Sequence, residues 1–233
     1  MVQIADIYLM QEPVSAGNAQ KAISLLTQAE ALGALRAKLV LGDIYREGKG
    51  VRANNQKAYD YYTQISDRYP NAMISIAEIS ADPTVARNYI AKASAQLEGE
   101  VNPSTQATIK LARHYRDGTL VARDLKKAEY WYGRAIEQES VSSMMELAEL
   151  WSETAHQPRS DVTSLWKVAA LNDNHRAALE MGFAHALGDG VERDGQLSGR
   201  YFQQAVELEP SNAYRIARWY EEREPLDLSL IHI

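Results

Sequence analysis

Large apolar, small and aromatic residues recur along this chain at the spacing of a helix. In the clearest stretch, Leu41 and Gly42 are followed by Tyr45, and residues three or four positions apart share one face of a helix. After a short polar stretch, Lys57-Ala58 precedes the aromatic pair Tyr61-Tyr62 with the same periodicity. The pattern predicts two amphipathic helices joined by a turn.

The same pattern returns 70 residues later and again after another 70, so that Gly48, Gly118 and Gly188 stand in register. Weaker copies divide this distance into periods of about 35 residues, and they contain Ile4-Ala5, Ile76-Ala77, Leu147-Ala148 and Ile216-Ala217. A fixed period of this length is typical of helical repeat proteins.

Glycines follow the first helix of each strong copy. A glycine adopts positive φ without a Cβ clash, which suits the residue directly after a helix. We therefore predict structural repeat turns at Gly48, Gly50, Gly118, Gly188 and Gly190. The polar residues that come next are predicted N-caps of the second helices, namely Asn54, Asp124 and Asp194, with Asp161 in the same role in the fifth copy.

A single helical hairpin cannot bury its own apolar face, so neighbouring hairpins must stack. The predicted fold is therefore an all-α, right-handed α-solenoid. We expect one solenoid over residues 1–227, with six repeats and a truncated seventh, and a non-native tail at 228–233. Because Ile4-Ala5 already stands in mid-helix register, we also expect the true N-terminus to lie upstream.

The order Leu-Gly-x-x-Tyr-x-x-Gly-x-Gly-Val, then Lys-Ala and two aromatic residues, resembles the Sel1-like repeat, a branch of the tetratricopeptide-type solenoids. Residues 41–65 match almost throughout. Residues 111–135 match with Thr119-Leu120 in place of the small residue and second glycine, and in residues 181–205 Leu197-Ser198 replaces Lys-Ala. The resemblance covers nearly the whole chain and implies a scaffold that binds other proteins.

Composition narrows the function classes further. The net charge is −6 and no dense basic run is present, which argues against a nucleic-acid partner. The absence of cysteine excludes disulfides, thiolate catalysis and cysteine-based zinc sites. No apolar run reaches the roughly 18 residues of a membrane helix, so no membrane span is predicted.

Candidate chemistry is sparse. The five histidines are His114, His156, His175, His185 and His232, and none has the spacing of a zinc helix. His185 stands at an aromatic repeat position and is predicted to pack, as are the four tryptophans. The glycine turns follow helices and lack the Gly-Lys-Ser/Thr ending of a P-loop. We therefore predict no catalytic residue, no cofactor and no metal site.

The outward positions of the first helices are the predicted partner surface, because these helices line the concave side of a solenoid, where partners bind. The candidate residues are Asp43, Arg46, Arg113, Arg116, Glu146 and Glu149. The partners are predicted to be proteins. Contact with a polysaccharide is an alternative that no feature of the sequence supports.

Within the family, residues 2–7 and 36–48 are similar to the scaffold lipoproteins of alginate export. That likeness implies a periplasmic or cell-envelope scaffold in exopolysaccharide secretion. An intracellular regulatory or signalling adaptor is the alternative. A β-lactamase-like enzyme is a third reading, since some cysteine-rich Sel1-like proteins carry that label, but this chain lacks their cysteines and a credible Ser-x-x-Lys motif.

Overall fold

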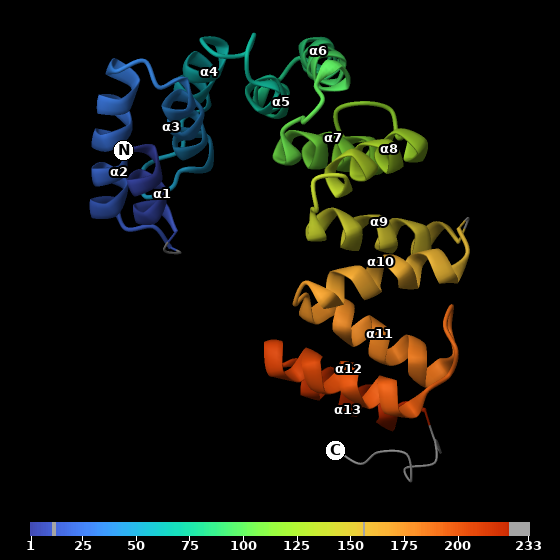
Figure 1. Ribbon diagram of the computed structural model, residues 1–233. Helices are drawn as coiled ribbons and strands as arrows, with labels where there is room; N and C mark the ends of the chain where they lie inside the picture. The colour runs from blue at the N-terminus through green and yellow to red at the C-terminus, as the bar shows by residue number, and fades with distance from the viewer. Residues whose placement is uncertain (11–12, 156, 224–233) are drawn as a thin grey trace. The chain divides into compact units, whose positions relative to one another are not determined.

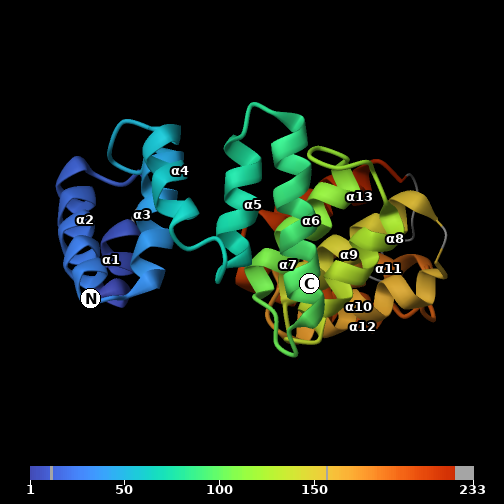
Figure 2. The same cartoon turned by 90° about the horizontal axis from the view of Figure 1, so that it is seen from above.

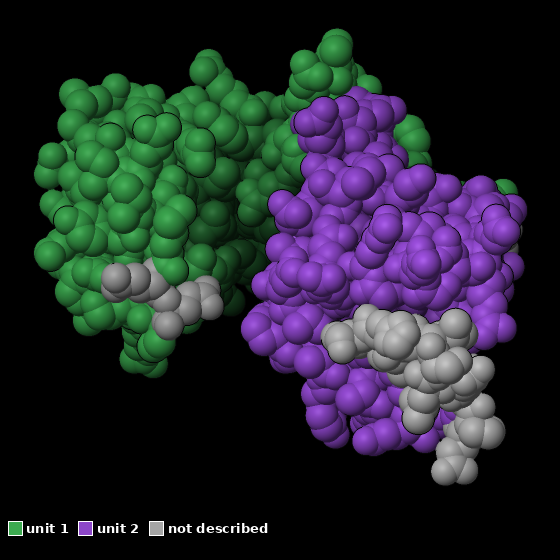
Figure 3. All heavy atoms as spheres, turned by 60° about the horizontal axis from the view of Figure 1, so that its bottom comes forward, with its two compact units in different colours: residues 1–131 green, residues 132–233 purple. Residues whose placement is uncertain are grey.

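A computed structural model describes residues 1–10, 13–155 and 157–223. The described residues contain thirteen α-helices and no strand. The tail predicted at 228–233, together with His156 and His232, lies outside them. The chain divides into two compact units, residues 1–131 and 132–233 (Figure 3), and each is described by itself.

Unit 1 alternates first and second helices of successive repeats. Its helices are α1 (Val2–Leu9), α2 (Ala16–Ala31), α3 (Leu35–Glu47), α4 (Asn55–Thr63), α5 (Pro70–Ile79), α6 (Pro83–Gly99) and α7 (Thr105–Asp117). Odd-numbered helices are the first helices and even-numbered ones the second. Within a repeat the two helices pack directly on each other, as α3 does on α4 and α5 on α6 (Figure 2).

The boundary between the units falls inside α8 (Leu125–Ile136). The remaining helices of unit 2 are α9 (Val141–Thr154), α10 (Arg159–Leu171), α11 (His175–Leu187), α12 (Gly195–Leu208) and α13 (Asn212–Glu221). Each of these packs on the next in chain order (Figure 1). The all-α solenoid class predicted from the repeat period is thereby confirmed.

The first helices of the strong repeats end at glycines in the left-handed conformation. Gly48, Gly118 and Gly188 have φ values of +70°, +67° and +74° and cap α3, α7 and α11. A second glycine serves a different purpose. A Cβ on Gly190 would lie 2.5 Å from the carbonyl oxygen of Arg159, so this turn needs glycine both for its φ and for close approach to the start of α10.

The second helices begin at polar caps. Backbone N–H groups of the first turn donate to the side chains of the three predicted caps, Asn54, Asp124 and Asp194. The prediction for the fifth repeat is wrong. There α10 already begins at Arg159, after Pro158, so Asp161 lies in the first turn, where a carboxylate still faces the positive end of the helix dipole.

Small residues on the first helices receive aromatic rings from the second helices. A Cβ on Gly42 would lie 2.4 Å from the Tyr62 ring, and a Cβ on Gly182 would lie 2.4 Å from the Phe202 ring. Tyr62 and Phe202 are themselves almost fully buried. The absence of a side chain at these two glycines therefore sets how closely the two helices of a repeat approach.

The prediction that His185 packs in the core is confirmed. Its ring is buried and stacks on Tyr201, with 5.7 Å between the ring centroids and an interplanar angle of 10°. In the second repeat, Tyr45 stacks on Tyr61 in the same way, with 6.0 Å between centroids. The histidine thus takes the structural role of the aromatic residue it replaces.

Candidate functional site

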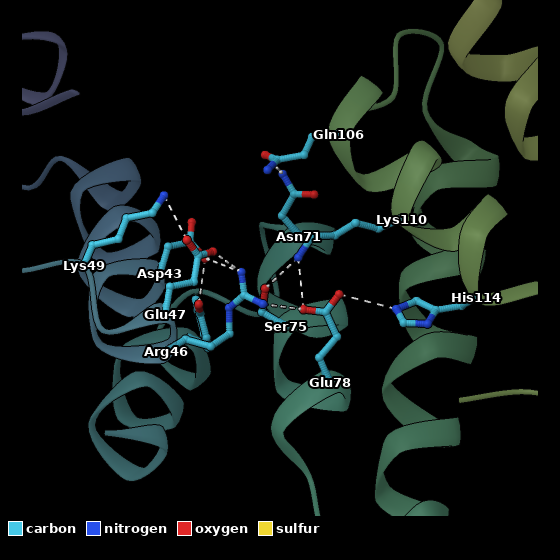
Figure 4. A network of polar contacts seen from close by, with 11 residues as sticks. Asp43, Arg46, Glu47, Lys49, Asn71, Ser75, Glu78, Gln106, Lys110 and His114 are labelled. Carbon is cyan, nitrogen blue, oxygen red and sulfur yellow. Dashed lines mark hydrogen bonds and ion pairs between the residues drawn. The ribbon is translucent and has the colours of Figure 1, made fainter. Parts of the chain in front are cut away.

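In unit 1 the first helices of three successive repeats share one face, which we call the first-helix face and define as the outward side chains of α3, α5 and α7. The middle helix, α5, contacts both α3 and α7. Polar side chains from all three helices point toward one another across this face (Figure 4). Residues from repeats far apart in the sequence therefore form one polar surface.

Glu78 on α5 is the centre of this surface. Its carboxylate accepts from Arg46 Nη1 at 3.0 Å and from Lys110 Nζ at 3.1 Å, and His114 Nε2 lies 3.4 Å away. Burial opposes its ionisation, but the hydrogen bond with His114 and the charges of Lys110 and Arg46 lower the pKa of Glu78 to about 2. Glu78 is therefore a stable anion that ties α5 to α3 and α7.

The network continues along α5 toward the start of the helix. Lys110 Nζ also donates to Ser75 Oγ at 3.3 Å. One turn earlier, the Asn71 amide donates to Ser104 Oγ at 3.2 Å and to Gln106 Oε1 at 3.3 Å. These bonds hold side chains of α5 and α7 in fixed positions relative to each other.

Two of the predicted surface residues are held by tyrosines. Asp43 accepts a 2.7 Å hydrogen bond from the Tyr62 hydroxyl, and Glu146 accepts one of 2.9 Å from the Tyr132 hydroxyl. Burial raises the pKa of Asp43, while the hydrogen bond from Tyr62 and the charge of Arg46 oppose that rise. Both residues are half-buried, and these hydrogen bonds help to fix the packing of the helices that carry them.

The other four predicted surface residues are Arg46, Arg113, Arg116 and Glu149. Arg46 pairs with Glu78, as described above. Arg116 Nε contacts Asp117 at 2.7 Å, and Glu149 forms an ion pair with Arg176 of the following first helix. Arg113 is exposed on α7. The partner surface assigned to these residues stays a prediction.

Glu78 was absent from the predicted surface, although the repeat register points to it. It stands 35 residues after Asp43 and 35 before Arg113, and therefore occupies the same position of its helix. The third repeat lacks the glycine turn that marks the strong copies, so the shared register position of Glu78, Asp43 and Arg113 is harder to see in the sequence. Lys110 and His114 contact Glu78 because α7 packs beside α5, and this packing cannot be read from the repeat spacing.

On α11 of unit 2 the equivalent position is aromatic. Phe183 stands 70 residues after Arg113 and lies half-buried on α11. Its ring centroid is 5.0 Å from that of Trp219 on α13, and the Arg223 guanidinium carbon lies 4.4 Å from the Trp219 centroid. Aromatic and arginine side chains dominate the energetics of many protein interfaces, so this group is a second candidate contact surface.

The described residues show no arrangement for metal chemistry, since no three His, Asp or Glu side chains gather around a common point there. Across the same residues, none of the helices has the length and apolar character needed to cross a bilayer.

A model of the Sel1 repeat matches residues 1–33, 36–68, 105–140 and 175–209, together more than half of the chain. The chain belongs to the Sel1 repeat family. The two segments between the matched copies contain α5–α6 and α9–α10, two pairs whose first helices do not end at a glycine. No curated protein matches this Sel1 repeat protein.

Solved structures share its fold. A Sel1 repeat protein from Oxalobacter formigenes is 20% identical with a TM-score of 0.70, over 100% of this chain and 94% of that one. A protective antigen with an SLR fold from uropathogenic Escherichia coli is 20% identical with a TM-score of 0.67, over 95% of this chain. This chain covers 48% of the antigen, about half of its length.

An immunity protein from Pseudomonas aeruginosa is 17% identical with a TM-score of 0.62, over 91% of this chain and 81% of that protein. At these identities the likenesses show the fold alone. The Sel1 repeat fold is typically a non-catalytic scaffold for protein interactions.

Proposed function

We propose that this Sel1 repeat protein is a non-enzymatic scaffold that binds another protein through its first-helix face. The observation that carries the proposal is the network around Glu78, in which charged side chains from α3, α5 and α7 are fixed by one another. Side chains that are already ordered lose less conformational entropy when a partner binds. Such a surface recognises a polypeptide by complementary charge.

Charges of both signs are available on this face. Asp43 and Glu47 lie on α3 beside Arg46, and Arg113 is exposed on α7. A surface with charges of both signs fixes how a partner is aligned on it and selects for one partner. A surface with charges of one sign would instead attract many oppositely charged molecules. In unit 2, the Phe183–Trp219 pair is a separate candidate contact surface of apolar character.

A photo-crosslinking residue placed on each side of unit 1 tests the proposal. Gln106 on α7 is exposed on the first-helix face, and Lys92 on α6 is an exposed control on a second helix. We expect protein adducts in cells from the Gln106 position and few from Lys92. Equal labelling from both positions, or none from Gln106, would argue against this face as the binding surface.

The identity of the crosslinked protein also separates the cellular roles. The exopolysaccharide-secretion hypothesis requires a component of the cell envelope, whereas the intracellular adaptor requires a regulatory protein. No contact in the structure supports one of these roles over the other, so both remain hypotheses. Loss of the adduct in a Lys110→Glu variant, which disrupts the Glu78 network, would tie the partner to this surface.

A further inference from the structure

We draw no further inference here: the strongest candidate, the apolar groove between α12 and α13 lined by Phe202, Ile216 and Tyr220, carries no proposal because nothing in the part of the chain that the structure describes shows what covers it.

Discussion

The Tyr62 hydroxyl on α4 donates a 2.7 Å hydrogen bond to the Asp43 carboxylate on α3. The ring of the same tyrosine packs over Gly42, the residue next to Asp43 in the sequence. One side chain thus fills the gap between the two helices of the repeat and also satisfies a half-buried carboxylate. The relationship ties the best-formed repeat to the candidate surface, because Asp43 neighbours Arg46 there.

Tyr62→Phe tests the hydrogen-bonded part of this contact. The ring stays in place, but the carboxylate of Asp43 loses its donor, and we expect a loss of about 1–2 kcal/mol in the free energy of unfolding. Chemical denaturation measures this loss. Tyr214→Phe, at an exposed tyrosine, is the control and should change stability by less than about 0.5 kcal/mol. Equal effects of the two substitutions would show that the bond to Asp43 contributes nothing measurable.

Two glycines of unit 2 should respond to alanine in opposite directions. A Cβ at Gly182 would lie 2.4 Å from the Phe202 ring, so Gly182→Ala should cost about 1–3 kcal/mol through overpacking. At Gly199, within α12, nothing lies within 4 Å of the new Cβ, so Gly199→Ala should stabilise by up to about 1 kcal/mol. Thermal or chemical melts giving the reverse order would refute the role assigned to the small repeat position.

The two glycines of the third strong turn have the same backbone conformation but different surroundings. Gly188 and Gly190 have φ values of +74° and +75°. The nearest atom to a Cβ on Gly188 would be 3.3 Å away, whereas a Cβ on Gly190 would meet the Arg159 backbone oxygen at 2.5 Å. Gly190→Ala should therefore destabilise more than Gly188→Ala, since both share the cost of positive φ. Matched denaturation curves measure the difference.

The network around Glu78 predicts a pH-dependent stability. The pKa of Glu78 in the folded protein is about 2, below the roughly 4.3 of an unfolded glutamate. A depressed folded pKa contributes stability that is complete above the unfolded pKa and is lost as the pH falls through the folded value. Glu78→Gln should therefore cost on the order of 2–3 kcal/mol at neutral pH, and this difference should shrink between about pH 4 and pH 2.

Unfolding free energies of both proteins across this pH range provide the measurement. Glu98→Gln, at an exposed site on α6, serves as the control for adding one amide to the surface. A stability difference between wild type and Glu78→Gln that is constant from neutral to acid pH would show that the Glu78 charge does not hold α5 to its neighbours.

Some residues of the chain are predictable because their roles are local. Gly48 and Asn54 act within one turn of a helix end, so their spacing to the neighbouring apolar residues is enough to place them. Asp161 shows the limit of the same reasoning. The loop before α10 differs in length from the glycine turns, and α10 begins about one turn earlier than predicted. Asp161, the predicted cap, therefore lies inside the helix.

The candidate surface was only partly predictable. Asp43 and Arg46 could be placed on the outward face of a helix from periodicity, but their partners belong to other helices. Glu78 could have been found by counting one period from Asp43. Phe183 could have been found by counting two periods from Arg113, although its contact with Trp219 depends on how α11 and α13 pack.

The sequence by itself determined the repeat, its helices and its glycine turns, because each depends on side chains a few residues apart and recurs with the same spacing. Only the tertiary structure decided which charges meet. Glu78 gathers Arg46, Lys110 and His114 because successive first helices lie side by side, and that placement depends on packing across repeats. The exposure of Ala217 likewise depends on how the helices pack, since Gly42 and Gly182 at the same repeat position each lie under an aromatic ring.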